Sequence, residues 1–213
     1  MSSNSQNLIP KWLENGFIKL LEPLINLIVK AGFHPNTFTI WGLILSVVGA
    51  VFFAFGYVRL GGVFILLGGV CDILDGKIAR KSNKVTKFGA LFDSSLDRYA
   101  EVFMFLGVAI YLERNEYFLT SIMIFIALGG STMVSYVRAR AEGLGYDCKV
   151  GLMQRPERVL LIGASALFHS YLLIASIWIV GFLSNYTAYQ RMKYVYVLEK
   201  QEKQEKEIKQ DEL

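Results

Sequence analysis

The residues best suited to chemistry are four aspartates that interrupt two apolar stretches: Asp72, Asp75, Asp93 and Asp97. The first two are three positions apart and the last two are four apart, so each pair lies on one face of a helix. Ionised carboxylates within a membrane helix are costly unless they are paired or solvated. Four of them close together would also repel one another. We therefore expect cations to hold this cluster together.

Divalent metal ions are the cations that this set of ligands favours. The chain has only two histidines and two cysteines, and they form no cluster that suits zinc. Carboxylate oxygens alone favour Mg²⁺ or Mn²⁺. Four carboxylates can hold two such ions about 4 Å apart, an arrangement that stabilises the attacking and leaving oxygens of phosphoryl transfer. The alternative is a set of interhelical salt bridges, but acids outnumber bases on these two faces.

Small residues and one arginine share the aspartate faces. Gly76, Ala79 and Arg80 continue the face of the first pair, and Gly89 begins the face of the second. The small side chains would let a diphosphate approach the helix backbone, and the Arg80 guanidinium would pair with its oxygens. The link between the two helices is short, which predicts antiparallel neighbours with their aspartate faces opposed.

The elements that must position these residues are membrane-spanning helices. Hydrophobic residues make up 54% of the 213-residue chain, against roughly 45–50% in soluble domains. They fall in blocks near the roughly 20 residues that a spanning helix needs. We expect an all-α integral membrane protein with six transmembrane helices, near 36–55, 60–80, 88–112, 117–140, 155–168 and 171–195.

The segments on either side of the spans are more polar. An amphipathic helix is predicted over 9–28, lying in the membrane interface or, alternatively, packed on protein. The Glu-, Lys- and Gln-rich end is predicted to be a solvated helix or a disordered tail. The chain thus divides into an N-terminal interfacial segment (1–33), a membrane domain (34–198) and a charged cytoplasmic tail (199–213).

Lysines and arginines gather at the end of the spans that carries the aspartates, whereas the other end has little beyond Arg59 and Arg114. The positive-inside rule then places both termini and the aspartates on the cytoplasmic side. Polar residues at several helix ends on this side could form a pocket for a phosphate monoester, although the same rule could explain the arginines. They are Ser135, Arg138, Arg140, Arg155, Arg158 and Arg191.

The motif D-x2-D-G-x2-A-R-x8-G-x3-D-x3-D, from Asp72 to Asp97, resembles the signature of the CDP-alcohol phosphatidyltransferase family at every position. The resemblance implies a homodimer of six-span subunits in which Asp72, Asp75 and Asp93 hold one ion and Asp72, Asp93 and Asp97 a second. It also implies that Asp97 takes the proton from the acceptor hydroxyl. The residues that it implies for binding the CDP-linked substrate are Asn36, Thr37, Phe38, Thr39, Asp75, Gly76, Ala79, Arg80 and Thr86.

The acceptor alcohol depends on a second resemblance. SYVRARAEGLG at 135–145 and GLMQRPERV at 151–159 are similar to the bacterial phosphatidylinositol phosphate synthases and their archaetidylinositol phosphate counterparts, in which the acceptor is inositol phosphate. The resemblance implies phospholipid biosynthesis: the phosphatidyl group of CDP-diacylglycerol, or an archaeal ether equivalent, passes to inositol phosphate and CMP leaves. It assigns Ser135, Arg138, Arg140, Arg155 and Arg191 to the acceptor. Some relatives have Lys at the Arg138 position, so the match supports a phosphorylated acceptor better than inositol itself.

Other interpretations remain open. Glycerol phosphate, serine or inositol could be the acceptor in the same reaction. A cation transporter could also use intramembrane aspartates, but it predicts acids spread along a path through the bilayer. We expect no nucleic-acid partner.

Overall fold

The computed structural model describes residues 10–211, in which the prediction of an all-α fold is confirmed. Every predicted span is a helix, and the predicted start of the first helix at residue 9 lies outside the described residues. The helices are α1 (Lys11–Lys30), α2 (Pro35–Ala54), α3 (Val58–Lys81), α4 (Lys87–Arg114), α5 (Phe118–Gly143), α6 (Arg155–Phe168) and α7 (Ser170–Asp211).

Local sequence explains where the helices of the aspartate end begin. Pro35 opens α2, where its fixed φ suits the first turn, and the His34 side chain accepts a hydrogen bond from the Asn36 backbone N–H at 3.3 Å. Thr86 caps α4, because its hydroxyl accepts from the Gly89 N–H at 2.9 Å. Pro156 stands in the first turn of α6. These starts fix the entry points of three helices that surround the aspartates.

Among the described residues, three helices are long and apolar enough to cross a membrane by themselves: α2, α5 and the Ser170–Ile208 part of α7. The chain is therefore an all-α membrane protein. The helices α3 and α4 carry the aspartates and several basic residues, which lowers their mean hydropathy. With 14 residues, α6 is about 21 Å long, shorter than the roughly 30 Å of a bilayer core.

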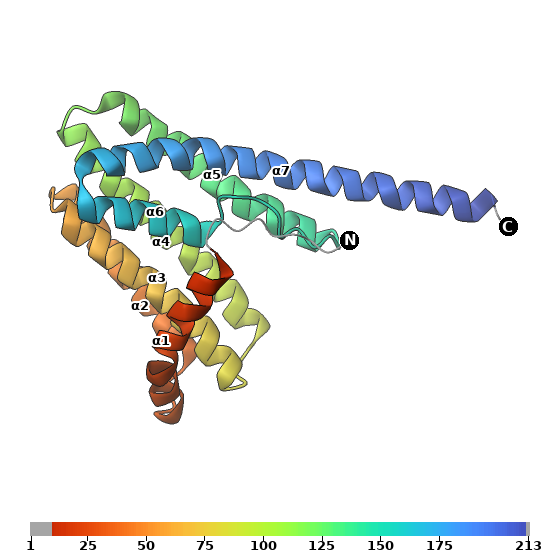
Figure 1. Cartoon of the computed structure of the whole chain (residues 1–213), viewed down its shortest axis with the longest axis horizontal. Helices are drawn as coiled ribbons and strands as arrows, with labels where there is room; N and C mark the ends of the chain where they lie inside the picture. Colours follow the sequence, from red (N-terminus) through yellow and green to blue (C-terminus); the bar gives the residue numbers. More distant parts are fainter. Residues whose placement is uncertain (1–9, 212–213) are drawn as a thin grey trace.

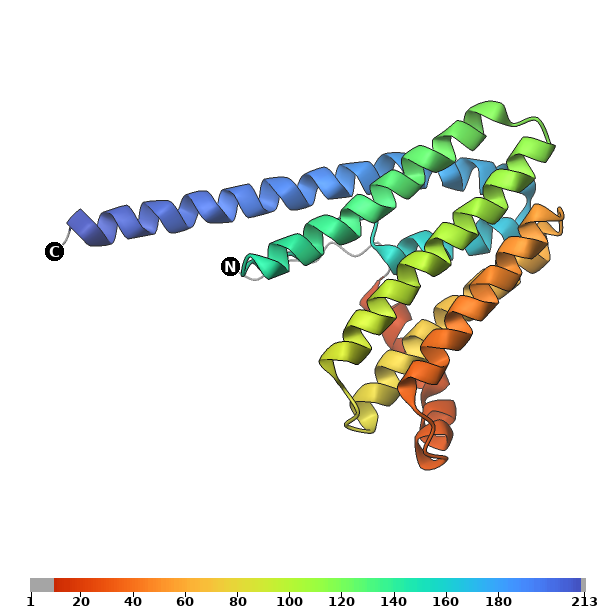
Figure 2. The same cartoon turned by 180° about the vertical axis from the view of Figure 1, so that it is seen from behind.

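The helices form a bundle from which α7 projects (Figures 1 and 2). α2 packs against α3 and α4, α3 against α6, and α5 lies along α7. The predicted last span ends at Val195, but α7 continues as one helix to Asp211. The helical alternative for the charged tail is therefore confirmed as far as Asp211.

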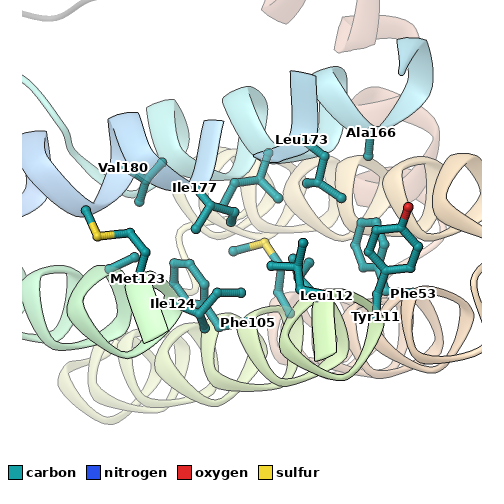
Figure 3. Packing of buried hydrophobic residues seen from close by; sticks show 14 of the residues in the cluster. Phe53, Phe105, Tyr111, Leu112, Met123, Ile124, Ala166, Leu173, Ile177 and Val180 are labelled. Carbon is teal, nitrogen blue, oxygen red and sulfur yellow. The ribbon is translucent and has the colours of Figure 1, made fainter. Parts of the chain in front are cut away.

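The apolar core lies among α2 to α7, with most of its residues on α4, α5, α6 and α7 (Figure 3). Phe105 of α4, Ile124 of α5 and Ile177 of α7 are fully or almost fully buried in it. Small residues let helices approach closely elsewhere. A Cβ atom on Gly62 of α3 would lie 2.7 Å from the Gly163 carbonyl oxygen of α6. The core thus holds α6 rigidly against α3, which carries the first aspartate pair.

The N-terminal helix combines both predicted placements. Ile25 and Ile28 are buried against Leu74 and Ile78 of α3, so the second half of α1 packs on protein. In the first half, Trp12 is 71% exposed, and most of the other apolar residues there are exposed as well. An exposed apolar face on a helix beside membrane spans suits the interface between lipid and water.

The prediction that the aspartate faces of the two helices are opposed is confirmed, but the close backbone packing expected of direct neighbours is not seen. α3 and α4 do not pack closely against each other along the described chain, and α2 packs against both. Gly42 and Ser46 of α2 are buried. Their small size lets α2 pack closely on α3, a packing that the length of the loop between α3 and α4 does not predict. The aspartate faces therefore meet through their side chains, since the Asp75 and Asp93 carboxyl groups hydrogen-bond, while the α3 and α4 backbones stay apart.

Candidate active site

The structure gathers the four aspartates at one end of the bundle. Asp75 interacts electrostatically with Asp72 and Asp93, and Asp97 interacts with the same two carboxylates. Asp75 is 5% exposed, and the Asp72 and Asp97 side chains are 17% and 16% exposed. Two helices thus bring four largely buried acids within range of one another, as the i, i+3 and i, i+4 spacings require.

Arg155 of α6 bridges the two aspartate helices. Its Nη1 lies 2.6 Å from Asp72 Oδ2 and 3.0 Å from Asp97 Oδ1. Charge-assisted contacts of this length offset part of the repulsion among the acids. Arg155 is predicted to bind the acceptor, and the structure places it directly on two predicted metal ligands. The acceptor end of the site and the carboxylates are therefore contiguous.

The donor set fits a hard divalent cation. As the side chains stand, no group of three or more His, Cys, Asp or Glu residues within 10–211 is arranged to hold an ion. Arg155 instead supplies positive charge between Asp72 and Asp97. Two buried oxygens, Asp75 Oδ2 and Asp93 Oδ1, have no hydrogen-bond partner in the described chain. Buried acceptors without partners are costly, and oxygen-only donors suit Mg²⁺ or Mn²⁺.

Several residues predicted to bind the CDP-linked substrate surround the carboxylates. The buried Thr39 hydroxyl hydrogen-bonds Asp75. A Cβ atom on Gly89 would lie 3.6 Å from Asn36 Oδ1 and 2.9 Å from the Thr86 hydroxyl. The first turn of α2 therefore faces the first turn of α4. Asp75 of α3 lies against the same part of α2, through its hydrogen bond with Thr39.

The diphosphate face of α3 is also formed. The Arg80 guanidinium folds back over Gly76, because a Cβ atom there would lie 3.3 Å from one of its nitrogens. Thr37 and Ala79 are half-buried. Phe38 packs against the apolar cluster of α1 and α3. The structure thus puts the Arg80 guanidinium over the glycine backbone that follows Asp75.

The structure does not bring all the predicted acceptor residues to one point. Arg138 forms an ion pair with Glu142 at 2.8 Å, and Arg140 is exposed. Arg191 is buried and donates to the backbone carbonyls of Val134 (2.6 Å) and Val150 (2.8 Å). It therefore ties α7 to α5 and to the loop before α6, and it lies within electrostatic range of Arg138. The half-buried Ser135 lies in α5, three residues before Arg138.

The loop between α5 and α6 carries one of the two cysteines. Cys148 is buried, and its thiol donates to the Arg191 carbonyl at 3.9 Å. Burial raises the pKa of the Cys148 thiol above its usual value, which keeps it protonated at neutral pH. Cys148 therefore packs the loop against α7 instead of acting as a nucleophile.

Sequence reasoning missed Arg98 and Glu101 beside the carboxylates, and it placed Arg158 only among the basic residues at the helix ends. Arg98 lies within electrostatic range of Asp93 and Asp97. Glu101 of α4 and Arg158 of α6 form a buried ion pair. Glu101 stands four residues after Asp97, so its position on the aspartate face was visible in the spacing.

Together, the fold and the site define an all-α membrane protein with a buried carboxylate cluster, bordered by arginines, that suits chemistry on a phosphate-linked substrate. The sequence profile of the CDP-alcohol phosphatidyltransferase family matches residues 33–188. This match covers more than half of the chain and includes all four aspartates. The chain belongs to the CDP-alcohol phosphatidyltransferase family and is an enzyme of that class.

Individual relatives are similar over most of their length. The phosphatidylinositol phosphate synthase of Mycobacteroides abscessus is 35% identical over 187 residues, which cover 84% of each chain. The archaetidylinositol phosphate synthase of Methanothermobacter thermautotrophicus is 34% identical over 162 residues, which cover 74% of this chain and 80% of the relative.

Solved structures show the same architecture. The crystal structure of Mycobacterium tuberculosis phosphatidylinositol phosphate synthase with CDP-DAG bound has a TM-score of 0.76 and 28% identity, and the match covers 84% of this chain and 94% of that one. The structure of the same synthase in complex with manganese and citrate has a TM-score of 0.72 and 29% identity, over 82% and 88% of the two chains.

Proposed function

We propose that this enzyme transfers the phosphatidyl group of CDP-diacylglycerol, or of an ether-lipid equivalent, to inositol phosphate, with release of CMP. The donor follows from family membership and from the CDP-DAG bound to the mycobacterial synthase. The acceptor follows from two relatives, one bacterial and one archaeal, that are both named inositol phosphate lipid synthases. The observation that carries the proposal is the convergence of four aspartates and Arg155 at one end of the bundle.

We assign the donor to the space bordered by α2, α3 and the start of α4. Arg80, beside Gly76, pairs with the diphosphate. Asn36 and Thr86 lie together at the starts of α2 and α4, and we assign the cytidine to this corner together with Thr37, Phe38 and Thr39. The lipid chains then extend into the bilayer along the exposed apolar surface of the spans.

We assign two divalent ions, Mg²⁺ or Mn²⁺, to the aspartates, with Asp72 and Asp93 shared, Asp75 completing one site and Asp97 the other. When bound, these ions offset negative charge on the diphosphate. The manganese complex of the mycobacterial synthase supports a divalent metal. The orphaned oxygens of Asp75 and Asp93 are the donors that such a cation would satisfy.

Asp97 takes the proton from the acceptor hydroxyl. The acceptor oxygen forms its bond to the β-phosphorus while the bond from that phosphorus to the CMP oxygen breaks. Arg155, which contacts Asp97 at 3.0 Å, is placed to bind the phosphate of the acceptor beside this base. Ser135, Arg138 and Arg140 then line the outer part of the acceptor path, and the buried Arg191 holds α5 and the loop before α6 in place behind them.

The same proposal fixes the placement in the membrane. We propose six spans formed by α2 to α7, with α3, α4 and the short α6 completed by their packing in the bundle. The membrane domain comprises residues 34–198, preceded by an interfacial segment (1–33) and followed by a charged tail (199–213). Basic residues at the aspartate end place the site and both termini in the cytoplasm. We further propose that the subunits form a homodimer.

The test is CMP release by the purified protein from CDP-diacylglycerol against a panel of acceptors: inositol phosphate, inositol, glycerol phosphate and serine. We expect turnover with inositol phosphate and at most about one hundredth of that kcat/KM with inositol, because losing a phosphate contacted by buried arginines costs at least about 3 kcal/mol. Turnover with inositol or serine but not with inositol phosphate would overturn the acceptor assignment. Metal-dependent CMP release with any acceptor would exclude a pure transporter.

A further inference from the structure

A second ion pair lies one helical turn deeper in the bundle than the contacts of Arg155. Arg158 Nε and Nη2 donate to the two carboxylate oxygens of Glu101, at 2.5 and 3.0 Å. The Arg158 side chain is 0% exposed and that of Glu101 is 4% exposed. The third donor, Arg158 Nη1, reaches the Met153 carbonyl at 3.0 Å. All the charged groups of this pair are therefore satisfied and shielded from water.

Such a pair is a poor way to gain stability. Desolvating two charges can cost more than their attraction returns, and well-packed apolar residues often stabilise a protein as much or more. What the two-pronged contact does provide is geometry, because an arginine fork matches a carboxylate in one orientation. Glu101 belongs to none of the predicted sites, and each guanidinium nitrogen of Arg158 already donates to Glu101 or Met153, so Arg158 is not free to bind a phosphate.

The pair stands in register with the active site. Glu101 follows Asp97 by four residues on α4, and Arg158 follows Arg155 by three on α6, so each lies one turn along the same face. The two helices are thus joined by two parallel contacts, Asp97 with Arg155 and Glu101 with Arg158. Arg155 Nε is buried without a hydrogen-bond partner among the described residues. The position of the Arg155 guanidinium therefore depends on the position of the α6 backbone.

We propose that Glu101 and Arg158 are positioning residues that set the height of α6 against α4 and thereby aim Arg155 at Asp72 and Asp97. A shift of α6 by one residue would move Arg155 by about 1.5 Å along the helix axis, enough to break contacts of 2.6 and 3.0 Å. Met153, held by Arg158 Nη1, places the loop before α6 at the same time. The effect of this positioning on acceptor binding rests on the proposed function, whereas its effect on the contacts of Arg155 with Asp72 and Asp97 does not.

The test compares Arg155→Ala, the double variant Glu101→Met/Arg158→Met and the triple combination. The double variant replaces the pair by apolar residues of similar length, which keeps the core filled. Mn²⁺ binding to the purified protein, without substrates, is measured by electron paramagnetic resonance. Removing the Arg155 charge from two ligands should tighten Mn²⁺ binding on the order of tenfold. The double variant should tighten it by about threefold, because Arg155 loses its aim, and the triple variant should match Arg155→Ala.

The non-additive result separates positioning from general stability. A folded double variant with wild-type Mn²⁺ affinity would overturn the proposal, as would a triple variant in which the effects simply multiply. Ser176→Ala is the matched control. Ser176 is 1% exposed, and its hydroxyl accepts a hydrogen bond from Ser165 of α6 at 3.0 Å, outside the carboxylate cluster. The Mn²⁺ affinity of this variant should stay unchanged. If the double variant does not fold, Arg158→Lys replaces it, because lysine keeps the charge but cannot make the two-pronged contact. Wild-type Mn²⁺ affinity in Arg158→Lys, or effects that simply multiply when it is combined with Arg155→Ala, would again overturn the proposal.

Acceptor kinetics give a second measurement. The double variant should raise the KM for inositol phosphate by about fivefold and leave the KM for CDP-diacylglycerol unchanged, because only the aim of Arg155 is disturbed. Equal changes in both constants would contradict a positioning role. A wild-type enzyme that does not use inositol phosphate would refute the proposed acceptor, and the Mn²⁺ comparison would still decide the role of the pair.

Discussion

Adding one methyl group to α2 should displace a predicted metal ligand. A Cβ atom on Gly42 would lie 2.8 Å from Asp72 Oδ1, against an ordinary contact of 3.4 Å or more. α2 also packs tightly on α4, where a Cβ atom on Gly107 would overlap the Ala50 backbone of α2, so α2 cannot move away from Asp72 freely. In Gly42→Ala the Asp72 carboxylate must therefore shift by about 0.6 Å. Asp72 also contacts Arg155 at 2.6 Å, so the shift disturbs the bridge between α3 and α4.

The size of the effect follows from that shift. A misplacement of about 1 Å near reacting groups can cost about 100-fold in rate, so a shift of about 0.6 Å should lower kcat roughly tenfold. Helix propensity favours Ala over Gly by up to about 1 kcal/mol, so the variant should remain folded.

Gly129→Ala of α5 is the control, because a Cβ atom there meets nothing within 4 Å. The assay is CMP release at saturating substrates and metal, with thermal unfolding followed in parallel. A folded Gly42→Ala enzyme with wild-type kcat would refute the placement of Asp72 in the site, whereas equal losses in both variants would point to a general effect of substitution.

Three further outcomes are expected. Asp97→Asn should lower kcat at least about 1,000-fold through loss of the base, while calorimetry still detects CDP-lipid binding; substantial turnover in this variant would remove Asp97 from that role. Arg155→Ala should raise the KM for inositol phosphate about tenfold or more, and an unchanged KM would count against a contact with the acceptor phosphate. Ending the chain after Leu198 removes the exposed contact of Tyr146 with Glu202 at 3.1 Å. Because exposed contacts of this kind contribute little, kcat/KM should stay within about twofold, and a larger loss would show that the tail supports the site.

The aspartate spacing was sufficient to predict the carboxylate cluster because helical periodicity is a local property. Asp72 and Asp75 must share a face whatever surrounds them. The contacts of Arg155 could not be predicted in the same way. They depend on how α6 packs on α3 and α4, and no pattern within α6 encodes that choice. Sequence analysis therefore placed Arg155 among acceptor residues, and only the packing shows that it also meets Asp72 and Asp97.

Two other features show where local reasoning stops. A short loop predicts antiparallel neighbours, but the small side chains of Gly42 and Ser46 let α2 pack closely on α3, and the α3 and α4 backbones stay apart. Glu101 is a single acid in an apolar stretch, and its partner Arg158 lies 57 residues away. Its spacing from Asp97 marks its face, yet only the fold supplies the arginine that makes it tolerable in the core.

The most direct measurement is the number and mutual distance of Mn²⁺ ions on the purified protein, read from titration and from spin coupling in the electron paramagnetic resonance spectrum. Two ions per chain with a coupled spectrum are expected, since shared carboxylates hold ions about 4 Å apart. Asp93→Asn should abolish the coupling, because Asp93 is assigned to both ions. One uncoupled ion per chain, or a coupled pair that survives in Asp93→Asn, would contradict a two-metal centre built on these four aspartates.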